Sequence, residues 1–225
     1  MFSRLDLILP IEAWDGPMQM ALDEVLLGEV LRPTLRIYEW SSHCVTFGYF
    51  QQIGVVRESY PGLPVVRRWT GGGMVDHGED LTFSLMIPSG ERMAADSPSA
   101  LYQGVHGNLA RWIQSQVPMP VQLAGPEDLR TGASCFQAPV HDDLMLHGKK
   151  VLGGALRRSG GGVLYQGSLR IRDIPGWNPG VFSPDALATS LGKDLGIMEL
   201  SANQVSKARN VCSLRYASRE WNERK

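Results

Sequence analysis

Cysteine is scarce in this chain of 225 residues, which contains only Cys44, Cys135 and Cys212. Three scattered cysteines are too few for a disulfide framework or a structural zinc site. Each thiol is therefore expected to be either a small buried apolar group or a nucleophile. A reducing cytoplasm is the compartment that fits such sparse cysteine usage.

Long apolar runs and a surplus of positive charge are also missing. No stretch approaches the ~20 apolar residues that a membrane-spanning helix needs. The first residues carry Asp6 within an apolar stretch and lack the pattern of a signal peptide. The 22 Lys and Arg residues are balanced by 23 Asp and Glu, a net charge of −1. This balance argues against a nucleic-acid-binding protein.

What the chain does contain is an ordinary globular composition, with 43% apolar and 20% charged residues. A chain of this length and composition can bury a sizeable core. We therefore expect residues 1–225 to form one domain.

Hydrophobic periodicity predicts an α+β protein built around a mostly antiparallel sheet. Two helices are indicated by apolar stripes at helical spacing, one before Pro33 and one before Pro118. The first stripe is Met18, Leu22, Val25 and Leu26, and the second is Leu101, Val105, Leu109, Trp112 and Ile113. Strands are expected at residues 5–9, 34–40, 44–47, 64–68, 81–86, 143–146, 151–158 and 163–171. A hairpin turn is expected at His147-Gly148, an irregular loop at 173–184, and helices at the end of the chain.

A glycine-rich loop follows one of these strands, in the stretch Arg67-Arg68-Trp69-Thr70-Gly71-Gly72-Gly73-Met74-Val75-Asp76-His77. Glycines allow positive φ, so backbone N–H groups can approach a carboxylate, a phosphate or an acyl oxygen. Arg68 adds a charged fork beside them. On their own, the glycines are more typical of a turn between two strands than of a binding site. The spacing matches neither common nucleotide-binding glycine motif.

Cys135 and Lys150 form the second candidate site. Cys135 follows Thr131-Gly132-Ala133-Ser134, a run of small residues that leaves a thiol accessible. A nearby ammonium would favour the thiolate that attacks acyl groups. Considered alone, a single cysteine more often belongs to a core, and a lysine after a hairpin turn, such as Lys149 or Lys150, to a solvated surface.

The two stretches together resemble a known superfamily. The pattern R-R-x-T-G-G-G-x-V-x-H followed by G-K-K-V-x-G-x-A is similar to that of lipoate–protein ligases, octanoyltransferases and biotin–protein ligases. Matching pieces also occur at 21–24, 35–40 and 47–51, so the resemblance runs from Leu22 to Arg172. It implies the biotin/lipoyl protein ligase fold, a mixed, mostly antiparallel sheet flanked by helices.

The resemblance also implies roles for particular residues. It implies that Lys150 reaches the acyl carbonyl and that an acyl pocket is lined by Arg68, Thr70, Gly71, Gly72, Gly73 and His77. Gly153-Gly154 stands where relatives usually have serine or alanine. We expect these two glycines to contact the acyl chain and to widen or loosen its pocket.

The position of Cys135 favours one branch of the superfamily. Ser134-Cys135-Phe136-Gln137-Ala138-Pro139 is similar to the S-C-F-x-x-P setting of Gram-positive-type octanoyltransferases, with the cysteine before the lysine hairpin. Other octanoyltransferases carry it after the lysine strand, where residues 158–162 have none. ATP-dependent ligases usually have an asparagine–aspartate pair near 135–136 and a C-terminal accessory domain, which we do not expect here.

This branch implies a reaction and its partners. An octanoyl or lipoyl group passes from a thioester donor such as octanoyl-acyl carrier protein, through Cys135, to a lysine of a lipoyl domain. The implied acceptors are the lipoyl domains of 2-oxoacid dehydrogenase subunits or the glycine cleavage H protein. A thioester already carries the activation, so neither ATP nor a metal cofactor is expected.

Three alternatives stay open at this point. The chain could be an ATP-dependent lipoate–protein ligase that uses ATP and Mg and acts through lipoyl-AMP. It could transfer acyl groups between lipoyl domains. It could also be a non-catalytic acyl-binding module.

Structural roles are expected for several other chemically suggestive residues. His43 and Cys44 point in opposite directions on a strand, and Cys212 should be buried in a terminal helix. The run His141-Asp142-Asp143 lacks a further cluster at metal-ligand spacing. Asp23 and Glu24 should make solvent or helix-cap contacts. A basic face, solvated or docking an acidic carrier protein, is expected from Arg67, Arg157, Arg158, Arg170 and Arg172.

Overall fold

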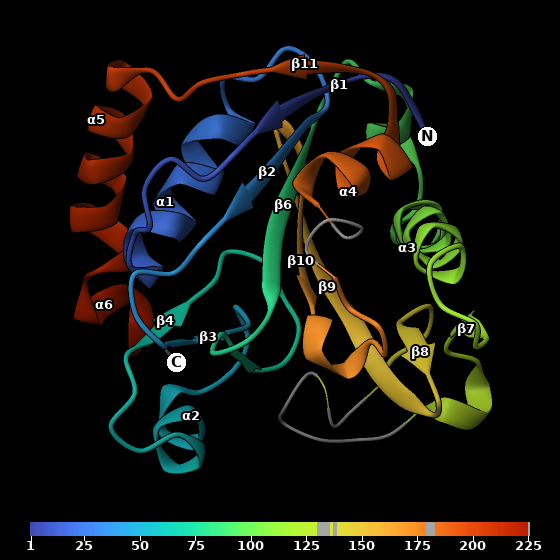
Figure 1. Cartoon of the computed structure of the whole chain (residues 1–225). Coiled ribbons are helices and arrows are strands. Elements are labelled where there is room, and N and C mark those ends of the chain that lie inside the picture. Colours follow the sequence, from blue (N-terminus) through green and yellow to red (C-terminus); the bar gives the residue numbers. More distant parts are fainter. Residues whose placement is uncertain (130–135, 137–138, 179–182, 225) are drawn as a thin grey trace.

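Eight strands form one mixed sheet in a computed structural model that describes residues 1–129, 136, 139–178 and 183–224. The strand order is β11-β1-β2-β6-β10-β9-β8-β7 (Figure 1). Three strands are parallel, namely β11 (Gly192–Ile197), β1 (Phe2–Ile8) and β2 (Thr34–Tyr38). From β2 onward every pairing is antiparallel, through β6 (Leu81–Pro88), β10 (Gly162–Leu169), β9 (Lys149–Ser159), β8 (Leu144–Leu146) and β7 (Val121–Leu123). The predicted mixed, mostly antiparallel α+β fold is confirmed.

One face of this sheet carries the main apolar core. Strand alternation sends Leu35, Phe83 and Tyr165 to this face. Two helices, α3 (Pro98–Gln114) and α4 (Pro184–Leu191), pack over it, on the right in Figure 1. The predicted apolar stripe of α3 is buried at Leu101, Val105, Leu109 and Ile113, whereas Trp112 is half-buried.

The opposite face is polar at its centre. The residues between those of the apolar core, Arg36, Ser84 and Gln166, point to this face and are buried there. Helix α1 (Gly16–Leu27) covers them, and α5 (Ala202–Val211) packs against α1, on the left in Figure 1. The Asp15 carboxylate caps α1 by accepting a hydrogen bond from the backbone N–H of Met18.

A second, three-stranded sheet positions the glycine loop. Its order is β4 (Val65–Arg67), β3 (Val45–Phe47) and β5 (Val75–Asp76). The chain between β4 and β5 is the glycine-rich stretch, so both ends of this loop are tied to β3. Helix α2 (Ile53–Ser59) follows β3 and packs beside β4.

The hairpin between β8 and β9 turns at the predicted residues, where His147 and Gly148 have φ of 50° and 70°. These left-handed conformations are typical of tight hairpin turns. Short 3-10 turns occur at Arg92–Ala95, Pro126–Asp128 and Ile171–Asp173. Residues 174–178 of the expected irregular loop have no regular structure, and 179–182 lie outside the described residues.

The helices expected at the end of the chain are present, but a strand that was not expected precedes them. Strand β11 pairs with β1 at the edge of the main sheet, between α4 and the terminal helices α5 and α6 (Arg219–Asn222). Its sequence is rich in glycine and charge, so the strand depends on backbone pairing with β1 and not on an apolar pattern. Strand β7, strand β5 and helix α2 are also additions to the predicted elements. No helix within the described ranges is long and apolar enough to cross a membrane.

Candidate functional site

The side chain of Arg68 holds the glycine loop in shape. Its Nη2 donates to the carbonyl oxygens of Gly71 and Gly73, at 2.9 and 2.8 Å, and its Nη1 donates to Thr46 Oγ1 at 2.7 Å. Gly72 between them has a φ of 86°, which favours glycine. Arg68 is 5% exposed. The guanidinium of Arg68, which was expected beside the ligand, therefore binds the carbonyl groups of its own loop.

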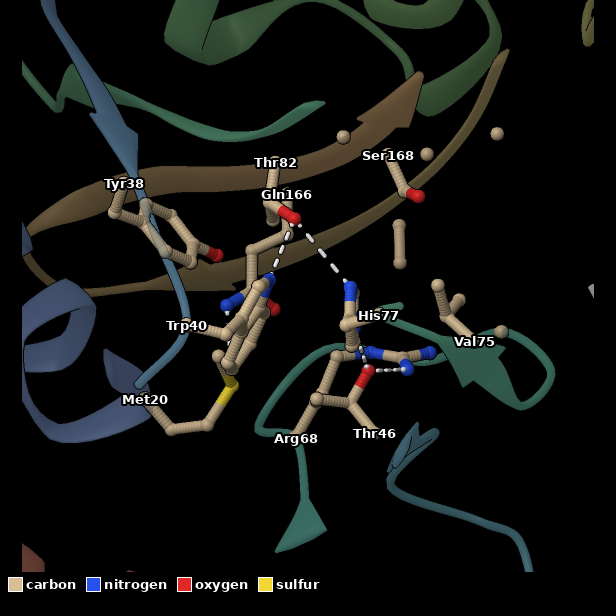
Figure 2. Close-up of a pocket in the computed structure, with 15 residues that line it drawn as sticks. Met20, Tyr38, Trp40, Thr46, Arg68, Val75, His77, Thr82, Gln166 and Ser168 are labelled. Atoms are coloured by element: carbon tan, nitrogen blue, oxygen red, sulfur yellow. Dashed lines mark hydrogen bonds between the residues drawn. The ribbon is translucent and has the colours of Figure 1, made fainter. Parts of the chain in front are cut away.

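A small cavity lies between this loop and the polar face of the main sheet (Figure 2). Of the residues expected to contact an acyl chain, Arg68, Gly72, His77, Gly153 and Gly154 line it. The other lining residues are Met20, Tyr38, Trp40, Thr46, Val75, Thr82, Ala155, Gln166, Gly167 and Ser168. Its volume is about 30 Å³, room for a water molecule or two.

Thr70, Gly71 and Gly73 stand behind the cavity and are not among its lining residues. Thr70 is buried, and its hydroxyl donates to Gln166 Oε1 at 2.7 Å. Gly71 and Gly73 supply the carbonyls that bind Arg68. These three residues therefore determine the shape of the loop.

His77 stands at one wall, stacked on Trp40 with ring centroids 4.2 Å apart (Figure 2). Its Nε2 lies 2.8 Å from Thr46 Oγ1 and its Nδ1 2.9 Å from Asp80 Oδ2. Because Thr46 Oγ1 accepts from Arg68, its own proton is available for Nε2, and Nδ1–H then donates to Asp80. This network fixes the orientation of the imidazole.

Asp80 is a buried member of the site that the sequence analysis missed. Burial by itself would raise the pKa of Asp80. Its closeness to His77 and the hydrogen bonds from His77, Ser168 and Thr82 nevertheless hold this pKa below its usual value. The only sequence signal for this pair was the spacing of His77 and Asp80, three residues apart between β5 and β6.

Asp23 lies directly beneath the cavity. Its carboxylate forms an ion pair with Arg36 Nη1 at 2.7 Å. It also accepts hydrogen bonds from Ser84 Oγ at 2.5 Å and Gln166 Nε2 at 2.7 Å. The expected solvent or cap contact is therefore wrong, because side chains from β2, β6 and β10 meet α1 here. Its neighbour Glu24 pairs with Arg215 and accepts from Tyr216.

Lys150 is not the solvated lysine that its hairpin position suggests. Its side chain is 2% exposed and its Nζ lies 2.7 Å from Asp143 Oδ2, whereas Lys149 is exposed. Burial raises the pKa of the Asp143 carboxyl, and Lys150 opposes that shift. The position of Lys150 in the sequence does not reveal this pair, because Asp143 comes from the other side of the hairpin turn, just before β8.

Lys150 lines a separate cavity of about 380 Å³, together with Met145, Arg170 and Phe136. The Phe136 ring centre is 5.7 Å from Lys150 Nζ and 4.6 Å from Arg170 Cζ. Cys135 and the small residues 131–134 before it lie outside the described residues. The structure thus brings Lys150 beside the chain neighbour of Cys135, and separates Lys150 from the lining of the glycine-loop cavity.

Gly154 contributes only backbone to the cavity, because a Cβ added there would overlap the Tyr165 ring on the apolar face. Gly153 points the opposite way along β9. The missing side chain at 154 therefore makes room for Tyr165, and only Gly153 is placed to widen the cavity.

The remaining chemical candidates have structural surroundings. Cys44 is buried, and burial raises the pKa of its thiol to about 12. Cys212 starts a π-helical turn (Cys212–Tyr216) and is half-buried, so its expected full burial is wrong. His43 lies 2.5 Å from Asp76. Within the described part of the chain no group of three or more His, Cys, Asp or Glu residues could hold a metal.

The predicted basic face does not exist as a unit, because Arg67 is 1% exposed. Its guanidinium donates to backbone carbonyls of the C-terminal segment and of the loop after β3. These are the carbonyls of Tyr49, Gln51, Trp221, Asn222 and Arg224. Arg67 therefore holds the C-terminus against the base of the glycine loop.

Comparison with known proteins agrees with this architecture. Residues 15–173 match the family model for the lipoyl protein ligase A/B catalytic domain. The chain belongs to this family. It is 33% identical over 183 residues to an octanoyltransferase LipM of Moorella thermoacetica, covering 72% of this chain and 66% of that protein. For the LipM of an Exiguobacterium species the figures are 33% over 177 residues, 72% and 64%. The chain thus spans just under two thirds of the length of these curated relatives.

Two solved structures show the same fold. Lipoate-protein ligase A bound with ATP superimposes with a TM-score of 0.70 at 22% identity, over 99% of both chains. A bi-partite lipoate protein ligase from Thermoplasma acidophilum gives 0.69 at 19% identity, over 99% of this chain and 96% of that one. At these identities the likeness concerns the fold alone.

Proposed function

We propose that this family member is a cysteine octanoyltransferase that modifies lipoyl domains. Cys135 takes the octanoyl group from a thioester donor such as octanoyl-acyl carrier protein and passes it to a lysine of the acceptor. The observation that carries this proposal is the closeness of Lys150 Nζ to Phe136, at 5.7 Å from its ring. Phe136 directly follows Cys135 in the sequence.

The proposed reaction has two steps. The Cys135 thiolate attacks the donor carbonyl, a new C–S bond forms, and the donor thiol leaves and takes up a proton. The neutral amine of the acceptor lysine then attacks the octanoyl-enzyme thioester. The amide forms, the Cys135–acyl bond breaks, and one proton is released to solvent. Lys150, as an ammonium, favours the thiolate and stabilises the negative charge that develops on the carbonyl oxygen.

The glycine-loop cavity is the proposed end of the acyl site. Arg68, His77, Gly72, Gly153 and the backbone of Gly154 form its walls, while Thr70, Gly71 and Gly73 hold the loop. At about 30 Å³ the cavity is too small for an eight-carbon chain, so side chains must shift on binding. Met20, buried at its edge, is the adaptable one because an unbranched thioether repacks easily.

The proposed acceptor is the lipoyl domain of a 2-oxoacid dehydrogenase subunit or the glycine cleavage H protein. Support comes from the related fold of the bi-partite ligase, whose structural study includes its E2 lipoyl domain. The names of the relatives support octanoyl as the acyl group. No nucleotide is proposed as a cofactor, because the donor thioester already supplies the activation.

Intact-mass analysis with octanoyl-acyl carrier protein, with and without MgATP, tests this function. We expect one octanoyl adduct without ATP, mapped to Cys135, and its transfer to a lipoyl domain. The Cys135→Ser variant should lose both, because serine is a far weaker nucleophile without a base. Cys212→Ser, at a half-buried thiol, serves as the matched control.

An adduct on Cys44 or Cys212 would contradict the proposal. So would modification of the lipoyl domain only with free lipoate and MgATP, retained by Cys135→Ser. That second result would identify an ATP-dependent ligase.

A further inference from the structure

Three side chains on one face of α3 form hydrogen bonds with Asp142, which directly precedes Asp143, the ion-pair partner of Lys150. Ser99 Oγ donates to Asp142 Oδ2 at 3.3 Å, and Gln103 Nε2 donates to Oδ1 at 3.4 Å. His106 Nδ1 lies 2.5 Å from the backbone carbonyl oxygen of Asp142. The spacing of 99, 103 and 106 places all three on the same side of the helix.

Asp142 needs such support because its backbone is in an unfavourable conformation. Its φ is 69°, in the left-handed region that costs an ordinary residue about 1 kcal/mol or more. The turn that contains it is also tied to β7, since Ala124 N donates to the Asp143 carbonyl at 2.7 Å. The conformation of Asp142 sets the direction in which the chain presents Asp143.

His106 is fully buried, and the two contacts of its ring determine its protonation. A backbone carbonyl only accepts hydrogen bonds, so Nδ1 carries the proton. Nε2 then accepts from the Tyr165 hydroxyl, 2.7 Å away. Burial lowers the pKa of His106 to about 4, which agrees with a neutral ring. Both ring nitrogens are therefore satisfied.

Tyr165 reaches His106 because β9 has glycine at position 154. A Cβ at that position would overlap the Tyr165 ring, which is itself buried among the residues of the apolar core. Gly154 is thus connected to Asp142 through the side chains of Tyr165 and His106.

We propose that His106 is a positioning residue for Lys150. Its Nδ1–H holds the Asp142 carbonyl, and this contact directs the Asp143 carboxylate onto Lys150 Nζ. Asp143 lies 2.7 Å from that nitrogen and also accepts from the backbone N–H of Val140 at 2.7 Å. His106 touches none of the reacting groups, so its effect is confined to the orientation of the lysine. The inference rests on the proposed function of Lys150.

Two substitutions of His106 separate its two hydrogen bonds. His106→Asn keeps an N–H near the position of Nδ1, whereas His106→Gln places its amide near Nε2 and gives up the bond to Asp142. The Asn108→Ala variant is the control, because the Asn108 amide donates to Gly104 within α3. The first readout is the rate at which an amine-acylating reagent labels Lys150, followed by peptide mass mapping. The second is kcat and KM for octanoyl transfer.

We expect His106→Gln to label Lys150 about tenfold faster and to lower kcat about tenfold, the effect of one hydrogen bond of about 1.4 kcal/mol. KM should stay within about twofold, because the contact of Lys150 that is weakened is made in the transition state and not in the bound ground state. His106→Asn should restore most of both quantities. Equal impairment in the Asn and Gln variants, or unchanged Lys150 labelling in His106→Gln, overturns the proposal.

Tyr165→Phe keeps the test decisive if His106→Gln does not fold, because it removes a single hydroxyl. The labelling rate of Lys150 should then rise about threefold, because the imidazole of His106 loses its hydrogen bond from Tyr165 and is positioned less firmly. Labelling equal to that of wild type overturns the proposal. The labelling experiment does not require acyl transfer. If the wild-type protein fails to transfer octanoyl, the proposed function is contradicted, and the labelling rate of Lys150 still tests the role of His106.

Discussion

The ion pairs Asp23–Arg36 and Asp143–Lys150 are both buried and have similar geometry. Both have a nitrogen–oxygen distance of 2.7 Å, and all four side chains are at most 2% exposed. Asp23–Arg36 lies under the glycine-loop cavity at the centre of the sheet. Asp143–Lys150 lies at the hairpin of β8 and β9, beside Phe136.

The chemistry of the two cations differs more than the geometry. The guanidinium of Arg36 is a rigid planar group, and Asp23 is also bound by Ser84 and Gln166. The ammonium of a lysine is a compact charge that can move on a flexible stem. Asp23–Arg36 is therefore suited to hold the floor of the site, and Asp143–Lys150 is suited to take part in its chemistry.

Breaking the Asp23–Arg36 pair should give the largest loss of stability. Arg36→Met leaves the Asp23 carboxylate buried without its cation, and removing one partner of a buried pair costs about 4 kcal/mol. Urea unfolding measures this loss, with Arg32→Met at an exposed arginine as control. A change in the free energy of unfolding no larger than that of the control would show that the pair contributes nothing.

Lys150→Met tests whether the second pair differs in role. The expected loss of stability is about 3 kcal/mol, because Asp143 is left buried and unpaired. A solvated lysine at this position would instead leave the stability almost unchanged on substitution. Acyl transfer should fall by about 100-fold or more, as after the loss of an oxyanion donor. Lys149→Ala, at the exposed neighbour, should change neither quantity appreciably.

The double variant Lys150→Met/Asp143→Leu separates the two effects. Replacing both charges with apolar groups of similar volume should restore most of the stability, while acyl transfer stays low. Recovery of transfer in the double variant would reduce Lys150 to a structural role.

Lowering the pH should reduce the stability of the protein, because His106, which supports the Asp143–Lys150 pair, is buried as a neutral imidazole. In the unfolded chain this imidazole takes up its proton near its ordinary pKa of 6.5, but in the folded protein only near pH 4. Between these values the unfolded state binds more protons, so stability falls as the pH is lowered. The expected loss is about 2 kcal/mol between pH 7 and pH 5. Urea unfolding of wild type and His106→Asn across this range isolates the effect, and parallel curves would refute it.

Substitutions of the two glycines of β9 should have the smallest effects, and the two positions should affect different properties. Gly154→Ala forces a methyl group against Tyr165, an overpacking that costs about 1.5 kcal/mol. Gly153→Ala adds its methyl group on the cavity side and should leave stability nearly unchanged. It should instead raise KM for octanoyl relative to shorter acyl groups. Thermal melting and acyl-chain competition measure the two outcomes, and a common response in both variants would contradict the assignment of opposite faces.

Local features of the fold were predictable because local sequence controls them. The apolar stripe of α3, the turn at His147-Gly148 and the presence of β6 follow from periodicity and backbone preference. Strand β11 was not predictable in this way. It is held by parallel pairing with β1, almost 200 residues earlier in the chain.

The sequence by itself determined the family. Its short motifs, which include the glycine loop and the segments around Cys135 and Lys150, indicated a family whose model matches residues 15–173. Only the tertiary structure decided how the residues of these motifs are used. Lys150 became a buried ion-paired amine, Asp23 part of a polar floor, and Arg68 a support for its own loop. The physical reason is that burial and pairing depend on side chains brought together from distant strands, and these set the solvation and charge that a motif does not specify.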